Sequence, residues 1–214
     1  MKVGILGSGE VGQTLAKAFT AEGHSTILGT HHPHKNEVKD FISNNPRIKV
    51  DTFEVAAAYG ELLALCVSGD AAEAVIDLAG AKNFSGKTVI DTTNPIAKQP
   101  PANGVLKYFT TMDQSLSEII QKKIPDAFVV KAFNSVGNSL MYKPSFDTKP
   151  SMFICGNDDG AKKTVTDILT AFGWETEDMG KIEAARAIEP LCMLWCIPGF
   201  LKNSWTHAFK LLKA

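Results

Sequence analysis

The 214-residue chain carries no large excess of charge and no long apolar run. Its formal net charge is −1, so no bulk positive field attracts nucleic acid or an anionic membrane surface. No apolar run approaches the ~20 residues needed to span a bilayer, and Met1-Lys2 leads into a strand pattern instead of a secretory signal. These absences predict a cytoplasmic protein that binds neither nucleic acid nor membrane.

Cysteine is scarce as well, with four residues in the chain. Cys66 and Cys155 lie inside apolar, strand-like runs, which predicts small core side chains. Cys192 and Cys196 are one helical turn apart, but no His or further Cys accompanies them at ligand spacing. We therefore expect no metal centre.

A glycine motif stands at the beginning of the chain. Residues 3–12 read VGILGSGEVG, an apolar run followed by Gly7-Ser8-Gly9-Glu10-Val11-Gly12 and then by a helical apolar pattern. Between a strand and a helix, G-x-G-x-x-G predicts dinucleotide binding. Gly7 permits the tight turn, Gly9 lets a pyrophosphate approach the backbone, and Gly12 allows close helix–strand packing. The N–H groups at the helix start face the phosphates, so Glu10 must point to solvent.

Strand and helix patterns alternate along the rest of the chain. We predict strands at residues 2–6, 25–28, 48–50, 61–67, 87–91, 127–131, 151–155 and, as an edge strand, 175–178. We predict helices at residues 10–22, 33–44, 53–59, 71–78, 113–122 and 158–172, and a helical pattern from Lys181 onward. This alternation predicts an α/β fold with a doubly wound, mostly parallel Rossmann sheet and a C-terminal helical extension. Residues 1–180 would form the nucleotide-binding domain and residues 181–214 the helical segment.

The turn after the second strand indicates which nucleotide binds. An NAD site places an Asp or Glu there, but the segment beginning at Leu28, LGTHHPHK, contains no acid. A 2′-phosphate requires donors and positive charge, which Thr30, His31 and Lys35 can supply at the start of a helix. The sequence therefore favours NADP(H) over NAD. The histidines, His32 among them, leave open a metal site or a plain solvated loop.

Small and amide residues follow the next three strands. The fourth strand ends in CVSG, the fifth in DTTNP and the sixth in KAFNSVG. Ligands of doubly wound sheets bind at these carboxyl ends. A nicotinamide headgroup needs donors and acceptors instead of charge, and Asn94 and Asn134 provide both.

Taken together, VGILGSGEVG, the basic turn, DTTNP and VVKAFN resemble the NADPH-dependent deazaflavin (coenzyme F-420) reductase family. The same segments are similar to the cytoplasmic reductase domain of six-transmembrane metalloreductases. The resemblance covers about residues 1–173. It implies a 2′-phosphate site at Thr30 and Lys35, where His31 and His32 replace the family's arginines. It also implies pyrophosphate contacts at Gly9, Glu10 and Val11, nicotinamide contacts at Val67, Ser68, Asn94 and Pro95, and Ala132, Phe133 and Asn134 beside the reacting ring.

The activity implied by the resemblance is hydride transfer between NADPH and a deazaflavin (F-420) or flavin acceptor. Such transfer requires two aligned rings and no catalytic acid or base. Two other readings stay open: a reductase of a small carbonyl or imine, and a non-catalytic NADP(H) sensor. The reductase would need a proton donor, for which Lys131, Glu189 and His207 are candidates. The pattern favours placing Lys131 at the solvent end of its strand and His207 on a polar helix face.

The C-terminal segment is rich in large apolar residues. Residues 191–212 include Met193, Leu194, Trp195, Phe200, Trp205 and Phe209, which predicts a helix buried against its own sheet or a second subunit. We expect a homodimer, with a small-molecule hydride acceptor as the other partner. Arg186 and Glu189-Pro190-Leu191 resemble the family's final helix, which lines the acceptor pocket and contributes to dimers. An acceptor pocket roofed by Trp195 or Trp205 is the alternative.

Overall fold

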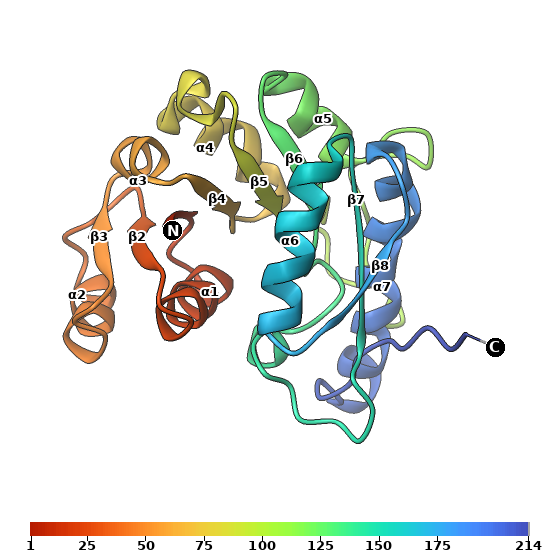
Figure 1. The fold of residues 1–214 in the computed structure, drawn as a ribbon. Coiled ribbons are helices and arrows are strands. Elements are labelled where there is room, and N and C mark those ends of the chain that lie inside the picture. Colours follow the sequence, from red (N-terminus) through yellow and green to blue (C-terminus); the bar gives the residue numbers. More distant parts are fainter. Residues whose placement is uncertain (214) are drawn as a thin grey trace.

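The computed structural model describes residues 1–213, apart from the side chain of Glu37. Within these residues, eight strands form one sheet in the order β3-β2-β1-β4-β5-β6-β7-β8. The strands from β3 to β6 are parallel, β7 is antiparallel to β6, and β8 is parallel to β7. This is the mostly parallel, doubly wound Rossmann-type fold that the sequence predicts, with β8 as its edge strand (Figure 1).

The predicted strands are all present, with small differences in their bounds. The strands are β1 (Lys2–Leu6), β2 (Ser25–Gly29), β3 (Lys49–Asp51), β4 (Leu62–Leu65), β5 (Thr88–Asp91), β6 (Phe128–Lys131), β7 (Ser151–Gly156) and β8 (Glu175–Asp178). The helices are α1 (Glu10–Ala21), α2 (Asn36–Asn44), α3 (Phe53–Tyr59), α4 (Ala72–Ala79), α5 (Leu116–Lys123), α6 (Asp159–Ala171) and α7 (Ala185–Lys202).

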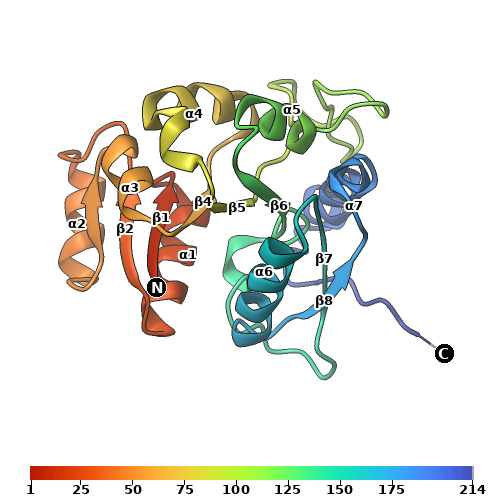
Figure 2. The same ribbon diagram turned by 45° about the horizontal axis from the view of Figure 1, so that its top comes forward.

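Helices cover both faces of the sheet (Figures 1 and 2). Helices α3, α4 and α5 pack on one face and α1, α2 and α6 on the other, each with its own buried apolar cluster. The central strand β4 contributes Leu63 and Leu65 to the first cluster and Leu62 and Ala64 to the second. The continuous apolar run in the sequence therefore reflects burial on both faces, as is usual for parallel strands.

Two helices begin later than the sequence predicts. Pro33 does not open α2, because it occupies the second position of a turn closed by the Lys35 N–H donating to the His32 carbonyl at 3.2 Å. Proline suits that position of a turn. Asp113 does not cap α5 either. Ser115 does, through a capping box in which its hydroxyl accepts from the Glu118 N–H and the Glu118 carboxylate accepts from the Ser115 N–H.

The prediction of a helix from Lys181 to the C-terminus is wrong beyond Lys202. Asn203 adopts a left-handed conformation (φ 52°) that ends α7, and residues 203–213 form neither helix nor strand. This tail returns to β7, where the Ser151 N–H donates to the Phe209 carbonyl at 2.9 Å. His207 is therefore not on a helix face. Its ring stacks on Trp195, with centroids 5.0 Å apart, and Nε2 bonds the Trp195 carbonyl at 3.0 Å.

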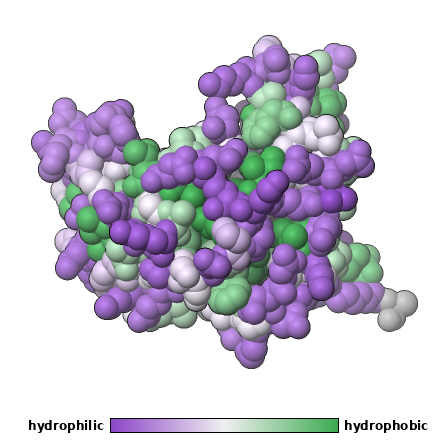
Figure 3. Space-filling model, turned by 90° about the horizontal axis from the view of Figure 1, so that it is seen from above, coloured by the Kyte–Doolittle hydropathy of each residue, from purple (hydrophilic) through white to green (hydrophobic). Residues whose placement is uncertain are grey.

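Helix α7 is less buried than its composition suggests. Trp195 is buried against Gly137, but Leu194, Phe200 and Leu201 are exposed. By length and composition alone, the span Ile182–Lys202 could cross a membrane, with a mean hydropathy of 1.3, although the core helices of soluble proteins meet the same criterion. Seen from above, the molecule is mostly hydrophilic, and hydrophobic residues gather toward the hollowed centre of this face (Figure 3).

Candidate functional site

The glycine motif forms the turn between β1 and α1, and its glycines have different roles. Gly7 has φ +134°, and a Cβ atom there would overlap the Cys66 carbonyl. A Cβ atom on Gly12 would overlap the Gly7 carbonyl, whereas one on Gly9 would meet no atom of the described chain within 4 Å. Gly7 and Gly12 are thus required by the fold, and Gly9 leaves open space for a ligand. Glu10 begins α1 and is exposed, as predicted.

A cleft of about 610 Å³ opens in front of this turn, at the carboxyl ends of β1, β4 and β5. Six of the predicted site residues line it: Gly9, Glu10, Val11, Val67, Ser68 and Asn94. The other lining residues are Cys66, Gly69, Asp70, Thr92, Thr93, Ile96 and Lys98. At its rim Lys98 pairs with Asp70 at 3.3 Å, a contact that the sequence analysis missed because nothing local indicates that the 92–115 loop reaches the turn before α4. The cleft lies where doubly wound sheets bind nucleotides.

A second hollow, of about 400 Å³, is lined by residues 31–35. His31 and His32 are exposed here, with their rings edge to face at 4.5 Å, and Lys35 immediately precedes α2. Thr30 is buried behind them. Its Oγ1 accepts from Ser8 Oγ at 2.9 Å, so its own hydroxyl proton can serve another acceptor. This bond joins the glycine turn to the basic turn.

Asn94 and Asn134 form a pair behind the cleft wall. Asn134 Nδ2 donates to Asn94 Oδ1 at 3.2 Å, and Asn94 Nδ2 donates to the Asn134 carbonyl at 2.9 Å. The Oδ1 atom of Asn134 is buried and has no partner among the described residues. Buried polar atoms are usually paired, so this acceptor is an exception among the buried side chains of the described residues. Phe133, which turns the chain here, is in the left-handed region (φ 61°).

Four residues predicted at the nicotinamide end do not line the cleft: Pro95, Ala132, Phe133 and Asn134. Pro95 is buried at the base of the 92–115 loop, where its carbonyl accepts from the Phe109 N–H at 2.9 Å. Ala132 and Phe133 are buried in the apolar cluster beneath α1 and α6. Asn134 is buried behind Asn94, which carries its half of the amide pair to the cleft.

The prediction that Lys131 marks the solvent end of its strand is wrong. Its side chain is 0% exposed, and Nζ lies 2.9 Å from Asp91 Oδ2 and 3.2 Å from Glu189 Oε1. It also donates to the Thr93 carbonyl at 2.6 Å. Burial lowers the pKa of Lys131, but the two carboxylates more than offset this, and the net pKa is raised. The group is therefore an ammonium ion, held at the carboxyl ends of β5 and β6.

Both carboxylates have further donors. Asp91 Oδ1 accepts from the Thr93 N–H at 2.9 Å and from the Thr93 hydroxyl at 2.7 Å, and Oδ2 accepts from the Ser117 hydroxyl. Glu189, on α7, accepts from the N–H groups of Leu116 and Ser117 at 3.0 Å each, at the start of α5. We call Asp91, Lys131 and Glu189 the buried ion cluster. It connects β5, β6, α5 and α7.

The cysteines and the remaining acids provide no obvious metal ligands. Burial raises the pKa of the Cys66 thiol to about 12 and that of Cys155 to about 12, as expected of core cysteines. Within residues 1–213, no group of three or more His, Cys, Asp or Glu side chains could hold a metal ion.

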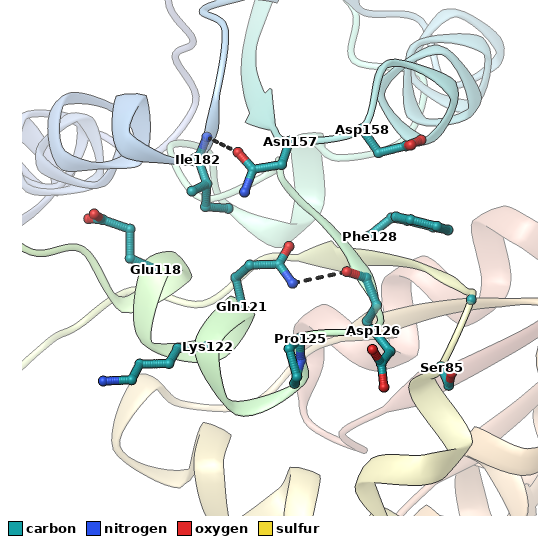
Figure 4. Close-up of a pocket in the computed structure, with 12 residues that line it drawn as sticks. Ser85, Glu118, Gln121, Lys122, Pro125, Asp126, Phe128, Asn157, Asp158 and Ile182 are labelled. Carbon is teal, nitrogen blue, oxygen red and sulfur yellow. Dashed lines mark hydrogen bonds between the residues drawn. The ribbon is translucent and has the colours of Figure 1, made fainter.

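A larger cavity, of about 790 Å³, lies away from the nucleotide cleft (Figure 4). Its walls come from α5, from the turns before β5 and β6, and from the turn after β7, where Asn157 Oδ1 accepts from the Ile182 N–H at 3.1 Å. This is the amino-terminal edge of β5 and β6. The predicted site residues all lie at the opposite edge.

Comparison with known proteins agrees with this geometry. Residues 2–95 match the family described as NADP oxidoreductase, coenzyme F420-dependent. A solved structure from Arthrobacter sp. FB24, described as an F420-dependent NADP reductase, is 30% identical, covers 100% of both chains and superposes with a TM-score of 0.93. The F420-dependent NADP reductase of Methanocaldococcus jannaschii is 26% identical over 91% of this chain and 90% of its own.

A longer relative shares the same segments. Metalloreductase STEAP3 of Rattus norvegicus is 30% identical over 94% of this chain, which spans 39% of that protein. The fold and the relatives together define an NADP-dependent oxidoreductase of the Rossmann type. Within that class, the chain belongs to the coenzyme F420-dependent NADP oxidoreductase family.

Proposed function

We propose that the protein transfers hydride between NADPH and a deazaflavin of the F420 type or a related flavin. The cleft at the carboxyl ends of β1, β4 and β5 is the observation that carries this proposal. It begins at the glycine turn and ends at Asn94, so an extended dinucleotide would lie with its pyrophosphate at one end and its nicotinamide at the other. Bound NADPH supplies the hydride, and the protein's own residues bind, orient and exclude water.

The basic turn would hold the adenosine end of the cofactor. His31, His32 and Lys35 surround a hollow in which a 2′-phosphate would meet donors and positive charge. Thr30 would donate its hydroxyl proton while it accepts from Ser8. The N–H groups at the start of α1, next to Gly9, would bind the pyrophosphate.

The amide pair would hold the nicotinamide end. Asn94 would face the carboxamide from the cleft wall, and Asn134, buried behind it, would hold Asn94 in place through their two hydrogen bonds. Val67 and Ser68 would border the ring from the end of β4. The side chains of Asn94 and Asn134 are uncharged, so they would orient the ring by hydrogen bonding alone.

The geometry favours carrier-to-carrier transfer over reduction of a carbonyl or imine. That reduction would require a proton donor at the cleft. Lys131 and Glu189 are buried and bonded to one another, and the His207 ring lies against Trp195. We also propose a cytoplasmic homodimer, in which the exposed Leu194, Phe200 and Leu201 of α7 would meet a second subunit. The molar mass measured by light scattering during size-exclusion chromatography tests whether the protein is a dimer.

Titration of the purified protein with NADPH and NADH, followed by nicotinamide fluorescence, tests the cofactor site. Tight NADPH and weak NADH binding are expected, and equal or preferential NADH binding would contradict the basic-turn assignment. Single-turnover oxidation of bound NADPH is then measured with F420, flavin mononucleotide, a ketone and an imine. Oxidation by the first two alone supports the proposal. Oxidation by the last two alone would favour the carbonyl or imine reductase, and oxidation by none would favour an NADP(H) sensor.

A further inference from the structure

The buried ion cluster has no proton to give to a substrate. Each proton of the Lys131 ammonium has an acceptor: Asp91 Oδ2, Glu189 Oε1 and the Thr93 carbonyl. The side chain is fully buried, and it does not line the cleft. Its contacts therefore indicate a role exerted through its neighbours.

One of these neighbours is the backbone that leads to Asn94. The Thr93 carbonyl accepts from Lys131 at 2.6 Å, while the Thr93 N–H and hydroxyl donate to Asp91. The peptide groups on both sides of Thr93 are thus fixed by the cluster. Asn94, the next residue, lines the cleft.

The other neighbour is one turn of α7, which also holds the second amide. Glu189 bonds Lys131, and the preceding Ile188 carbonyl accepts from Asn134 Nδ2 at 3.0 Å. Asn94 and Asn134 are bonded to each other. Both amides are therefore connected to the same turn of α7. Asn94 is connected through Thr93 and Lys131, and Asn134 bonds the Ile188 carbonyl directly.

We propose that Lys131 is a positioning residue, whose ammonium fixes Asn94 and Asn134 relative to each other and so sets the nicotinamide geometry for hydride transfer. This inference rests on the proposed NADPH pose. Loss of the ammonium would free the Thr93 carbonyl and remove the ionic link between α7 and β6, so the two amides would no longer be held in a fixed relative position. The basic turn at residues 30–35 lies on other elements and would be unaffected.

The experiment compares Lys131→Met and Lys131→Arg with a matched control, Lys87→Met. Lys87 is a part-buried lysine on the same sheet that donates to the Ala57 carbonyl at 2.7 Å, and it does not line the cleft. Binding of 2′,5′-ADP, which lacks the nicotinamide, is measured beside binding of NADP⁺. The hydride step is measured in single turnovers with saturating NADPH and its 4-deuterated form.

Lys131→Met is expected to bind 2′,5′-ADP as the wild type does, to bind NADP⁺ about tenfold more weakly, and to transfer hydride about tenfold to a hundredfold more slowly with a full isotope effect. Lys131→Arg keeps the charge and should recover part of the rate. Lys87→Met should change none of these values. A merely structural role would lower the amplitude of the single turnover, because less protein is folded, and would leave its rate and isotope effect unchanged. That result would overturn the inference.

The binding ratio separates this inference from the proposed acceptor. If the wild type transfers hydride to no acceptor, the proposed function fails, and the ratio of the 2′,5′-ADP and NADP⁺ affinities still tests Lys131. The positioning role would be contradicted if Lys131→Met lost affinity for 2′,5′-ADP and NADP⁺ equally, or if neither affinity changed. If Lys131→Met does not fold, the same measurements on Lys131→Arg decide, because unchanged rates and affinities there would contradict the need for the ammonium's geometry.

Discussion

Replacing Lys131 with methionine is expected to destabilise the folded protein strongly, because two carboxylates would remain buried without their cation. Removing one partner of a buried ion pair typically costs about 3–5 kcal/mol. Here Asp91 keeps its bonds from Thr93 and Ser117, and Glu189 keeps two backbone N–H groups at the start of α5. These remaining donors favour the lower end, about 3 kcal/mol, out of a total stability of about 5–15 kcal/mol.

Urea unfolding followed by tryptophan fluorescence measures this, since Trp174 and Trp195 are buried. Lys87→Met controls for the loss of a lysine bond to a neutral acceptor and should cost about 1 kcal/mol. The triple variant Lys131→Met, Asp91→Asn, Glu189→Gln removes all three charges and should recover part of the stability. A cost below about 1 kcal/mol for Lys131→Met would refute the reasoning.

Four other substitutions test three separate features. Thr30→Asp should repel a 2′-phosphate and reduce the NADPH/NADH affinity ratio by about tenfold or more, and an unchanged ratio in the fluorescence titration would mean that the basic turn does not hold the phosphate. Gly9→Ala should weaken NADPH binding without changing the melting temperature. Gly12→Ala should lower the melting temperature, because its Cβ atom would overlap the Gly7 carbonyl. Equal melting temperatures for the two variants would contradict this division of roles. Bonding to Arg186 lowers the pKa of Glu118 to about 2, so its stabilisation is present above the unfolded pKa of about 4.5 and is lost as pH falls toward 2. Solvent screens this partly exposed pair, so Glu118→Gln should cost about 1 kcal/mol in urea unfolding at pH 7 and less at pH 3. An equal cost at both pH values would exclude this pair as the cause.

The parts of the fold that the sequence predicts well are those determined by short-range patterns. The run ELLALCV identifies β4 because a strand buried on both faces must be apolar throughout. The glycine motif identifies the first turn because only glycine fits at Gly7 and Gly12. Six predicted residues reach the cleft because strand ends meet at one edge of a parallel sheet.

The errors occur where distant segments decide the outcome. A lysine at the end of a strand is usually solvated, so its burial depends on a partner that the local pattern does not show. The pairing of Lys131 with Asp91 could have been predicted from the sequence, because the two residues end adjacent strands, where they are in register. The pairing of Lys131 with Glu189 could not have been predicted, because it depends on where α7 packs. The tail from Asn203 misleads for the same reason: the Phe209 carbonyl bonds β7 and the Trp205 ring packs on Trp195, where no helix is needed.

In the proposed NADPH pose, the two ends of the site are specified in different ways. The adenosine end would lie on turns that follow β1 and β2 and are linked by the bond between Ser8 and Thr30, both within the first 35 residues. The nicotinamide end would lie against β5, β6 and α7, which a buried charge network connects. Because the two ends share no bonded residue, a change of nucleotide preference need not disturb the ring geometry, and a change of ring geometry need not disturb nucleotide preference.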